Sequence, residues 1–284
     1  MIFPFRDDVP SQRTPLVTYA IIALNVVSLL WVSQLGSLDR QLLAVHYGFV
    51  PARLSQLTNP QPVVVDIQRL AQLPHLPGPV AVRQPVQLDP VRSQILASLL
   101  TALFLHAGWL HLLGNMWFLW IFGDNVEDRL GHVAFACLYL GGGVVASLCH
   151  GWMTADPLVP VIGASGAVAA VLGAYAITWP LARIHSIVVL VIFVTIIELP
   201  ALVVLGFWFL TQLLEAGNAL NQGVDGGVAW WAHVGGFVFG VVWMQVLSIG
   251  APPPTPHGDH FKEEWMERHG RRPRRLEDWD TEDA

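Results

Sequence analysis

Three short polar motifs interrupt the long apolar stretches of this 284-residue chain. The first, F-L-H-A-G-W-L-H-L-L-G-N, contains His106, His111 and Asn115. The second, P-V-I-G-A-S-G-A, contains Ser165, and the third, A-W-W-A-H-V-G-G-F, contains His233. A hydroxyl beside an imidazole is the smallest nucleophile–base pair, because the imidazole can take the proton as the oxygen attacks a carbonyl. The sequence therefore predicts that Ser165 and His233 form a hydrolytic pair.

Such a reaction also needs hydrogen-bond donors for the oxyanion that forms on the attacked carbonyl. Asn115 can donate through its amide and His111 through an imidazole N–H. These two residues are four apart, so they share one face of a helix. The backbone N–H of Ser165, expected at a helix start, is a third donor. Gly163 and Gly166 beside it allow a substrate or another backbone to approach closely.

Each of these residues also has an alternative explanation. A serine in an apolar helix often bonds the carbonyl of the preceding turn, and a histidine near a helix end often lies at the membrane interface. Zinc binding by His106, His111 and His233 is a second kind of chemistry, but neither an H-E-x-x-H motif nor a neighbouring carboxylate accompanies them. We therefore expect no metal and no other cofactor.

The composition indicates that lipid is the main solvent of the chain. Hydrophobic residues make up 54% and charged residues 13%, against roughly 25% charged residues in soluble domains. Only two basic and seven acidic residues occur between Gln94 and Gly250. These values exclude a disordered chain, a collagen-like fibre and a secreted disulfide scaffold, and they argue against a soluble enzyme. No basic stripe or motif suggests a nucleic-acid partner.

We expect an all-α membrane bundle of six transmembrane helices, because a helix needs about 20 apolar residues to cross the hydrocarbon core. The predicted spans cover residues 16–35, 109–126, 132–153, 164–180, 201–215 and 229–249. The apolar run from Ser186 to Ile197 has only twelve residues and precedes Glu198 and Pro200. A run of this length is expected to lie at the membrane interface instead of crossing.

An even number of spans places both termini on one side of the membrane. Arg129 and Arg183 lie in short loops on that side, whereas the short loops 154–163 and 217–228 contain no Lys or Arg. Positive residues favour the cytoplasmic side. We therefore expect a cytoplasmic N-terminal segment (1–15), a transmembrane domain (16–250) and a cytoplasmic charged tail (251–284).

The first loop, about residues 36–108, is then external. Five arginines between residues 36 and 93 argue for the opposite orientation, but the rule weakens for loops of about 60 residues. The loop is rich in Pro and Gln, so we expect it to be extended or partly ordered, with little chemistry of its own.

This topology places the chemistry-bearing residues at one depth. His111, Ser165 and His233 each lie near the start of an outside-to-inside span, so they could meet in the outer part of the membrane. Gly236 and Gly240 form G-x-x-x-G, which lets membrane helices approach closely. We expect them to bring the last span against the fourth.

The chain resembles the rhomboid family of intramembrane serine proteases up to about Ile249. The resemblance rests on H-A-G-W-L-H-L-L-G-N-M, G-D-N-V-E-D-R-L-G, G-A-S-G and A-H-V-G-G-F-V-F-G, in that order. The opening P-F-R-D-D and the segment Y-G-F-V-P-A-R-L are similar to the bacterial multi-pass branch, which implies a bacterial inner membrane.

The resemblance implies a serine endopeptidase that cleaves transmembrane protein substrates near their outer ends. Ser165 would be the nucleophile and His233 the general base, in a dyad without a third member. His111, Asn115 and the Ser165 backbone would form the oxyanion hole. The residues expected to support this site are His106, Gly163, Gly166, Gly236 and Gly240, and those expected to hold the cytoplasmic end of the second span are Glu127 and Arg129.

The sequence departs from the family pattern at two places. The first loop lacks the Trp-Arg pair of the best-known bacterial members. Some members also place an aromatic residue four positions after the nucleophile, against the catalytic imidazole, where this chain has Ala169. Another group must therefore orient His233. The resemblance implies that substrates enter sideways past the fifth span, on which Phe207 and Trp208 either form a gate or face lipid.

Two other functional classes compete with the protease. A non-catalytic rhomboid-like protein would bind membrane clients, although family members of that kind usually lack the Ser or the His. A transporter or channel would need polar groups across the whole membrane, whereas the polar groups here cluster on one side. For the protease, activity should fall on acidification, because a general base must be neutral.

Overall fold

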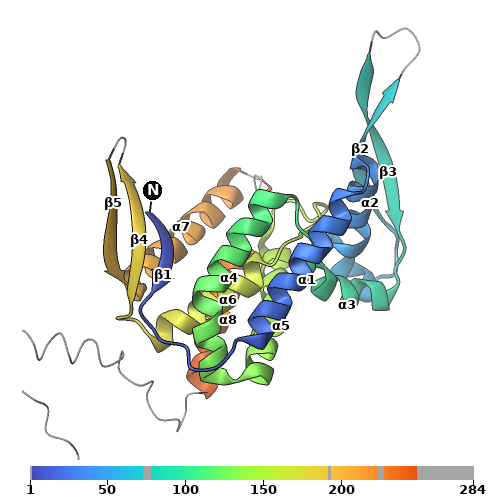
Figure 1. Cartoon of the computed structure of the whole chain (residues 1–284). Coiled ribbons are helices and arrows are strands. Elements are labelled where there is room, and N and C mark those ends of the chain that lie inside the picture. Colours follow the sequence, from blue (N-terminus) through green and yellow to red (C-terminus); the bar gives the residue numbers. More distant parts are fainter. Residues whose placement is uncertain (1, 73–77, 191–192, 223–226, 248–284) are drawn as a thin grey trace, which may run out of the picture.

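Helices dominate the computed structural model, which describes residues 2–72, 78–190, 193–222 and 227–247 (Figure 1). The charged tail from residue 251 lies outside these ranges. A helix occupies each of the six predicted spans: α1 (Leu16–Ser33), α4 (Trp109–Leu130), α5 (His132–Met153), α6 (Ser165–Thr178), α7 (Ala201–Gln222) and α8 (Trp230–Leu247). α7 continues past its expected end at Glu215, so part of the loop expected over residues 217–228 is helical.

The chain is a multi-pass membrane protein with four or five candidate spans among the described residues. By length and composition α1, α5, α7 and α8 can cross a membrane, and α4 qualifies together with the preceding helices as a pair bent by 82°. α6 has 14 residues and is therefore about 21 Å long, shorter than a hydrocarbon core of about 30 Å. The expected count of six spans is not confirmed, because α6 falls short.

The chain is mostly helical, as expected, but two antiparallel sheets that the all-α expectation did not include accompany the helices. β1 (Ile2–Asp7), β4 (Arg183–Leu190) and β5 (Phe193–Pro200) form one sheet in the order β1-β4-β5. The apolar run expected to lie at the interface forms most of β4 and β5, with Ile187 opposite Ile196. Its β-branched residues favour strands. Strand pairing also gives hydrogen-bond partners to the backbone N–H and C=O groups of this apolar run.

The N-terminal segment completes that sheet. β1 pairs with β4, and the indole Nε1 of Trp117 on α4 donates to the carbonyl of Pro4 over 2.8 Å. The backbone N–H of Arg183 donates to the carboxylate of Asp8 over 2.9 Å. Segments far apart in sequence therefore join at this end of the bundle.

The described part of the first loop is largely ordered, more so than the extended or partly ordered segment that was expected. It contains α2 (Ser37–Tyr47), α3 (Arg92–Thr101), the short 3-10 helices Pro51–Leu57 and Ala102–Phe104, and the hairpin β2 (Val63–Gln72)–β3 (Pro79–Leu88), which projects as an arm (Figure 1). Alternating apolar residues give the hairpin one face that can be buried. That face builds a small separate core with α2, made of Val45, Val50, Val65, Ile67 and Leu88.

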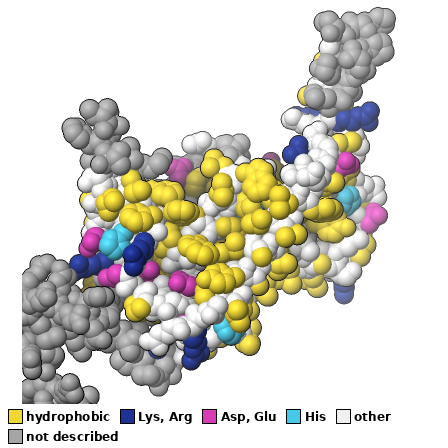
Figure 2. All heavy atoms as spheres, viewed as in Figure 1, with side chains coloured by type: hydrophobic (Ala, Val, Ile, Leu, Met, Phe, Trp, Pro, Cys, Tyr) yellow, Lys and Arg dark blue, Asp and Glu magenta, His cyan; other side chains and the backbone are white. Residues whose placement is uncertain are grey.

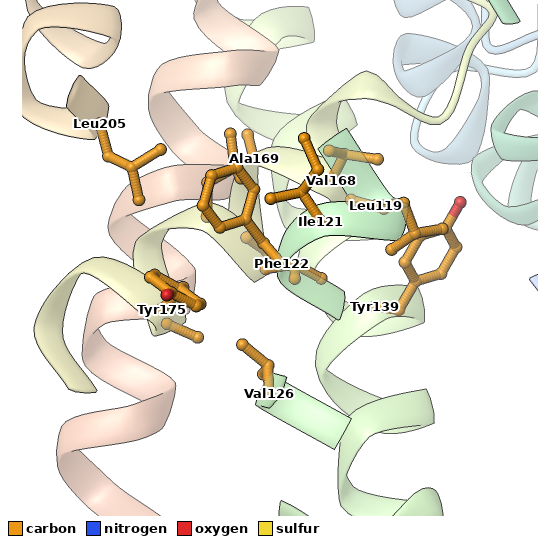
Figure 3. Close-up of a cluster of buried hydrophobic side chains, with 14 of the residues drawn as sticks. Leu119, Ile121, Phe122, Val126, Tyr139, Val168, Ala169, Tyr175 and Leu205 are labelled. Atoms are coloured by element: carbon orange, nitrogen blue, oxygen red, sulfur yellow. The ribbon is translucent and has the colours of Figure 1, made fainter. Parts of the chain in front are cut away.

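The core of the bundle surrounds α6. Every residue of α6 from Gly166 to Ala176 is buried, and most are Ala, Gly or Val, so neighbouring helices can approach closely. Phe122 on α4 stands at the centre of this core, with side chains from α5, α6 and α7 around it (Figure 3). Its ring meets that of Tyr175 edge-on at 4.8 Å between centroids.

The outer surface of the helices is apolar. Hydrophobic side chains cover the face that α1 and α4 form, whereas charged side chains gather toward the sheet and the arm (Figure 2). Exposed residues on these two helices include Leu24, Trp31, Leu113 and Trp120. Apolar patches of this extent on a multi-pass membrane protein are the surface that contacts lipid.

Candidate active site

Ser165 is the first residue of α6 and follows a turn that needs glycine. Gly163 has φ +125°, a left-handed conformation that L side chains rarely adopt. A Cβ at this position would also lie 2.7 Å from Cε1 of His111. The missing side chain therefore permits the turn into α6 and brings the His111 ring against the residues before Ser165.

α6 and α8 pack with almost no side chains between their backbones. A Cβ added at Gly236 would lie 2.1 Å from the carbonyl oxygen of Gly166, and one at Gly240 would lie 1.8 Å from that of Ala170. Such contacts are possible only for glycine. The expected approach of the last span to the fourth is thus present in the structure, and it places the start of α8, with His233, beside the start of α6.

A cavity of about 700 Å³ opens at this junction. Four predicted site residues line it: His111, Asn115, Ser165 and His233. They come from three helices, α4, α6 and α8, and each stands near the first turn of its helix. The structure therefore brings the candidate nucleophile, base and oxyanion donors to one space that a ligand could occupy.

The α4 residues are held by short-range contacts. The Asn115 amide donates one N–H to the carbonyl of His111 over 3.1 Å, which leaves its second N–H available. The rings of His106 and His111 meet edge-on at 5.1 Å. The backbone N–H of Ala164 donates to Nε2 of buried His106 over 3.5 Å. His106 therefore contacts both His111 and the residue before Ser165.

The imidazole of His233 is bound by groups from α7. Its Nδ1 lies 2.7 Å from Oε1 of Gln212, and its ring centroid lies 5.9 Å from that of Trp208. Trp230 on α8 meets the same ring edge-on. Sequence reasoning missed Gln212, because a lone Gln in an apolar helix resembles an interfacial residue. The only signal was indirect, since Ala169 left the orienting group of His233 unidentified.

The two aromatic residues singled out on α7 face different ways. Trp208 is half-buried and lines the cavity, whereas Phe207 is exposed on the outer surface. His150 at the C-terminal end of α5 also lines the cavity, and sequence reasoning did not single it out. Within the described residues, no three His, Cys, Asp or Glu side chains form a group that could hold a metal ion.

The first loop holds the segment that leads to Ser165. Phe49 and Val161 exchange two backbone hydrogen bonds of 3.0 and 2.8 Å, and the N–H of Ala52 donates to the carbonyl of Pro157 over 2.8 Å. The N–H of Gly163 donates to the carbonyl of Ala102 over 2.9 Å. The loop expected to carry little chemistry therefore fixes the backbone beside the nucleophile.

Glu127 and Arg129 lie at the far end of α4, away from the cavity. The carboxylate of buried Glu127 accepts the backbone N–H groups of Val17 and Thr18, at 2.8 and 2.7 Å, and the Thr18 hydroxyl at 2.7 Å. It also lies 2.5 Å from Nδ1 of His132. Glu127 thus joins the starts of α1 and α5, while half-buried Arg129 lies in the last turn of α4.

A second carboxylate joins the sheet to this end of the bundle. Asp7 Oδ2 accepts the Tyr175 hydroxyl at 2.5 Å and the Asn125 amide at 2.7 Å. Burial raises the pKa of Asp7 to about 7, with the negative charges of Asp124 and Asp8 adding to the shift and the Tyr175 hydrogen bond opposing it.

Comparison with known proteins places this arrangement in a family. A sequence model of the rhomboid domain matches residues 93–249, more than half of the chain. Rhomboid-like protein 11, chloroplastic, of Arabidopsis thaliana is 32% identical over 162 residues, which cover 52% of this chain and 51% of that protein. Rhomboid protein 1, mitochondrial, of Saccharomyces cerevisiae is 32% identical over 168 residues, which cover 57% and 44% of the two chains.

A third relative matches this chain at similar identity. Presenilin-associated rhomboid-like protein A, mitochondrial, of Danio rerio is 33% identical over 150 residues, which cover 49% of this chain and 34% of that protein. The chain therefore spans about half or less of the length of these curated relatives. The domain match includes the helices that carry Ser165 and His233, and it confirms the resemblance seen in the sequence: the chain belongs to the rhomboid family.

Proposed function

We propose that the protein is an intramembrane serine endopeptidase that hydrolyses peptide bonds of transmembrane protein substrates. One observation carries the proposal: Ser165, His233, His111 and Asn115 line one cavity in a bundle that is otherwise apolar. Polar residues inside a membrane cost free energy, so those that line a cavity are candidates for a functional site. Membership of the rhomboid family supports the same chemistry.

In the proposed reaction, the Ser165 oxygen attacks the carbonyl carbon of the scissile peptide bond while the His233 imidazole takes the hydroxyl proton. The carbonyl oxygen becomes an oxyanion, stabilised by Asn115, His111 and the Ser165 N–H. The imidazolium then gives its proton to the leaving nitrogen as the C–N bond breaks. Water attacks the resulting ester while the imidazole takes one of its protons. The imidazolium then returns that proton to the Ser165 oxygen as the ester C–O bond breaks, which releases the acid product and restores the free serine.

We further propose that cleavage occurs near the outer membrane face, with both termini, the segment 1–15 and the tail 251–284 in the cytoplasm. The short length of α6 supports this depth, because its first residue, Ser165, can then start below the membrane surface. The matched relatives are named as chloroplast and mitochondrial proteins, so the comparisons do not support the expected bacterial inner membrane.

The decisive experiment compares the wild type with Ser165→Ala in detergent and in lipid, using a panel of model transmembrane substrates. Ser165→Ala should abolish cleavage while leaving membrane insertion and thermal unfolding unchanged. Ser33→Ala, which alters an exposed serine at the end of α1, is the matched control and should cleave normally. Cleavage by Ser165→Ala at the wild-type rate would overturn the proposal.

A non-catalytic rhomboid-like protein that binds membrane clients is the alternative, and the names of two of the three relatives described above contain the words rhomboid-like. The same substrate panel separates the two functions. A binding protein would retain transmembrane segments without cleaving them, and Ser165→Ala would bind as the wild type does.

A further inference from the structure

The side chain that holds His233 comes from α7 and not from the helix of the nucleophile. Gln212 is buried, and its Oε1 lies 2.7 Å from Nδ1 of His233. A hydrogen bond between an imidazole and an amide has two possible polarities, because a neutral histidine can carry its proton on either nitrogen. The direction of this bond decides which ring nitrogen is free to act as a base. The other contacts of the Gln212 amide show which direction it has.

Those neighbours define how the amide is oriented. The Nε2 of Gln212 lies 3.2 Å from the backbone carbonyl oxygen of Trp208 and 3.0 Å from Oγ1 of Thr211. A carbonyl oxygen only accepts hydrogen bonds, so the NH₂ group and not Oε1 faces Trp208. The Thr211 hydroxyl donates its own proton to the same carbonyl, at 2.6 Å. It therefore acts as the acceptor in its hydrogen bond with Gln212.

Both amide hydrogens are therefore directed at acceptors within α7, and Oε1 is the atom that faces His233. Because Oε1 cannot donate, Nδ1 of His233 must carry the proton. The other ring nitrogen, Nε2, then has the lone pair.

We propose that Gln212 is a positioning residue that holds His233 in the Nδ1–H tautomer, so that Nε2 is the atom that takes the Ser165 proton. This inference rests on the proposed protease function and deepens it. In serine proteases with a triad, a buried carboxylate selects this tautomer and stabilises the imidazolium that forms. Here a neutral amide selects the tautomer, and it stabilises the imidazolium only through its carbonyl dipole.

On α6, the position that carries an aromatic residue in some family members holds alanine. Ala169 stands four residues after Ser165 and is completely buried. Its Cβ would lie 3.3 Å from a Cβ at Gly236 of α8. The methyl group of Ala169 cannot stack on an imidazole, so this position of α6 supplies no ring that could orient His233. Trp208 and Gln212, one turn apart on α7, supply a ring and a hydrogen bond instead.

The test uses two substitutions and a matched control. Gln212→Met keeps the length of the side chain without an acceptor, and Gln212→Glu keeps the acceptor but adds a negative charge. Gln222→Met makes the first change at an exposed position of the same helix. For each variant, kcat and KM for a transmembrane substrate are measured from pH 5 to pH 9, and activity is normalised to the folded fraction.

We expect Gln212→Met to lower kcat about 10- to 100-fold with little change in KM, less than the factor of about 10⁴ seen when a triad carboxylate is replaced by an amide. Gln212→Glu should restore most of the activity at high pH. It should also move the acidic limb of the pH–rate profile to higher pH, because a carboxylate stabilises a protonated imidazole. A purely structural role would leave both kcat per folded molecule and that limb unchanged in both variants, which would overturn the inference.

A second measurement does not depend on turnover. In ¹⁵N NMR of histidine-labelled protein, with His233 assigned by its loss in His233→Asn, the wild type should show a protonated Nδ1 and an unprotonated Nε2. Gln212→Met should shift the tautomer population, and Gln222→Met should not. An Nε2–H tautomer in the wild type would overturn the inference. A protein that has the expected tautomer but does not cleave would contradict the proposed function alone.

Discussion

Two polar clusters lie at opposite ends of α4 and differ in what their polar atoms face. In the Ser165 cluster, His111, Asn115, Ser165 and His233 line a cavity of about 700 Å³, and buried His106 packs against His111. The Glu127 cluster consists of two groups held by short hydrogen bonds: Glu127 with Thr18 and His132, and Asp7 with Asn125 and Tyr175. Buried polar residues are therefore not evidence of chemistry by themselves. A neighbouring space for a ligand is what distinguishes the first cluster.

The N-terminal N–H groups of α1 and α6 differ in the same way as the two clusters. The first N–H groups of α1 donate to the carboxylate of Glu127, so the unpaired donors of that helix end are satisfied within the protein. At the start of α6, the N-cap residue is Ala164, which has no side chain that could accept these N–H groups, and Ser165 lines the cavity. Donors of this kind attract negative charge, which at the start of α6 would be the oxyanion of the substrate.

Among the variants that test this difference between the clusters, Asn115→Ala should have the largest effect, and the effect should be on kcat. Asn115→Ala removes an oxyanion donor, so kcat should fall about 10²- to 10³-fold, while the unfolding temperature changes little. Asn218→Ala, at an exposed position on α7, is the control and should behave as the wild type does. Full activity in Asn115→Ala would remove this residue from the proposed oxyanion hole.

Glu127→Ala should lower the stability of the protein and leave its catalytic activity intact. It leaves the first N–H groups of α1 without their acceptor, so the free energy of unfolding should fall by about 2–4 kcal/mol, as measured by denaturation in detergent. Activity per folded molecule should stay near that of the wild type. Glu198→Ala, which breaks an exposed ion pair with Arg183 at 3.2 Å, is the control and should cost about 0–1 kcal/mol. A catalytic loss at Glu127 as large as that expected at Asn115 would contradict the comparison.

The smallest effect concerns the pH dependence of stability. The pKa of Asp7 is raised from 3.8 to about 7, first because the carboxyl is buried, so the folded state holds its proton more tightly than the unfolded state. The contribution of Asp7 to stability is therefore greatest below pH 3.8, is lost as the pH rises to about 7, and is constant above that. Asp7→Asn keeps an acceptor for Tyr175 and should flatten this part of the curve. An unchanged slope between pH 4 and 7 would show that another group causes it.

Sequence reasoning located the helices well because each signal is local. A stretch of about 20 apolar residues and a glycine, proline or charge at its end predict the bounds of a membrane helix. The predicted start of α5 at His132 and its end at Met153 match the structure, whereas α7 extended past Glu215 because its next residues still pack against neighbours. The polar residues of the Ser165 cluster could be enumerated for the same reason, since few polar groups interrupt the apolar spans.

The partners of those residues could not be predicted in the same way. Glu127 binds Thr18 across 109 residues of sequence, and Asp7 binds Tyr175 across 168. Nothing in the local pattern identifies such pairs. The extent of order in the first loop was underestimated and the β4–β5 hairpin was missed for a related reason, because strand pairing and loop docking depend on backbone hydrogen bonds between distant segments.

The sequence by itself determined the apolar helices, the family motifs and the few residues that could carry chemistry, because hydrophobicity and residue type are properties of each segment alone. Only the tertiary structure decided which polar residues face a cavity and which form hydrogen bonds with one another. It also showed that α7 supplies Gln212 to His233, while α6 and α8 meet directly through Gly166 and Gly236. These contacts join segments that are distant in the sequence, so no single segment encodes them.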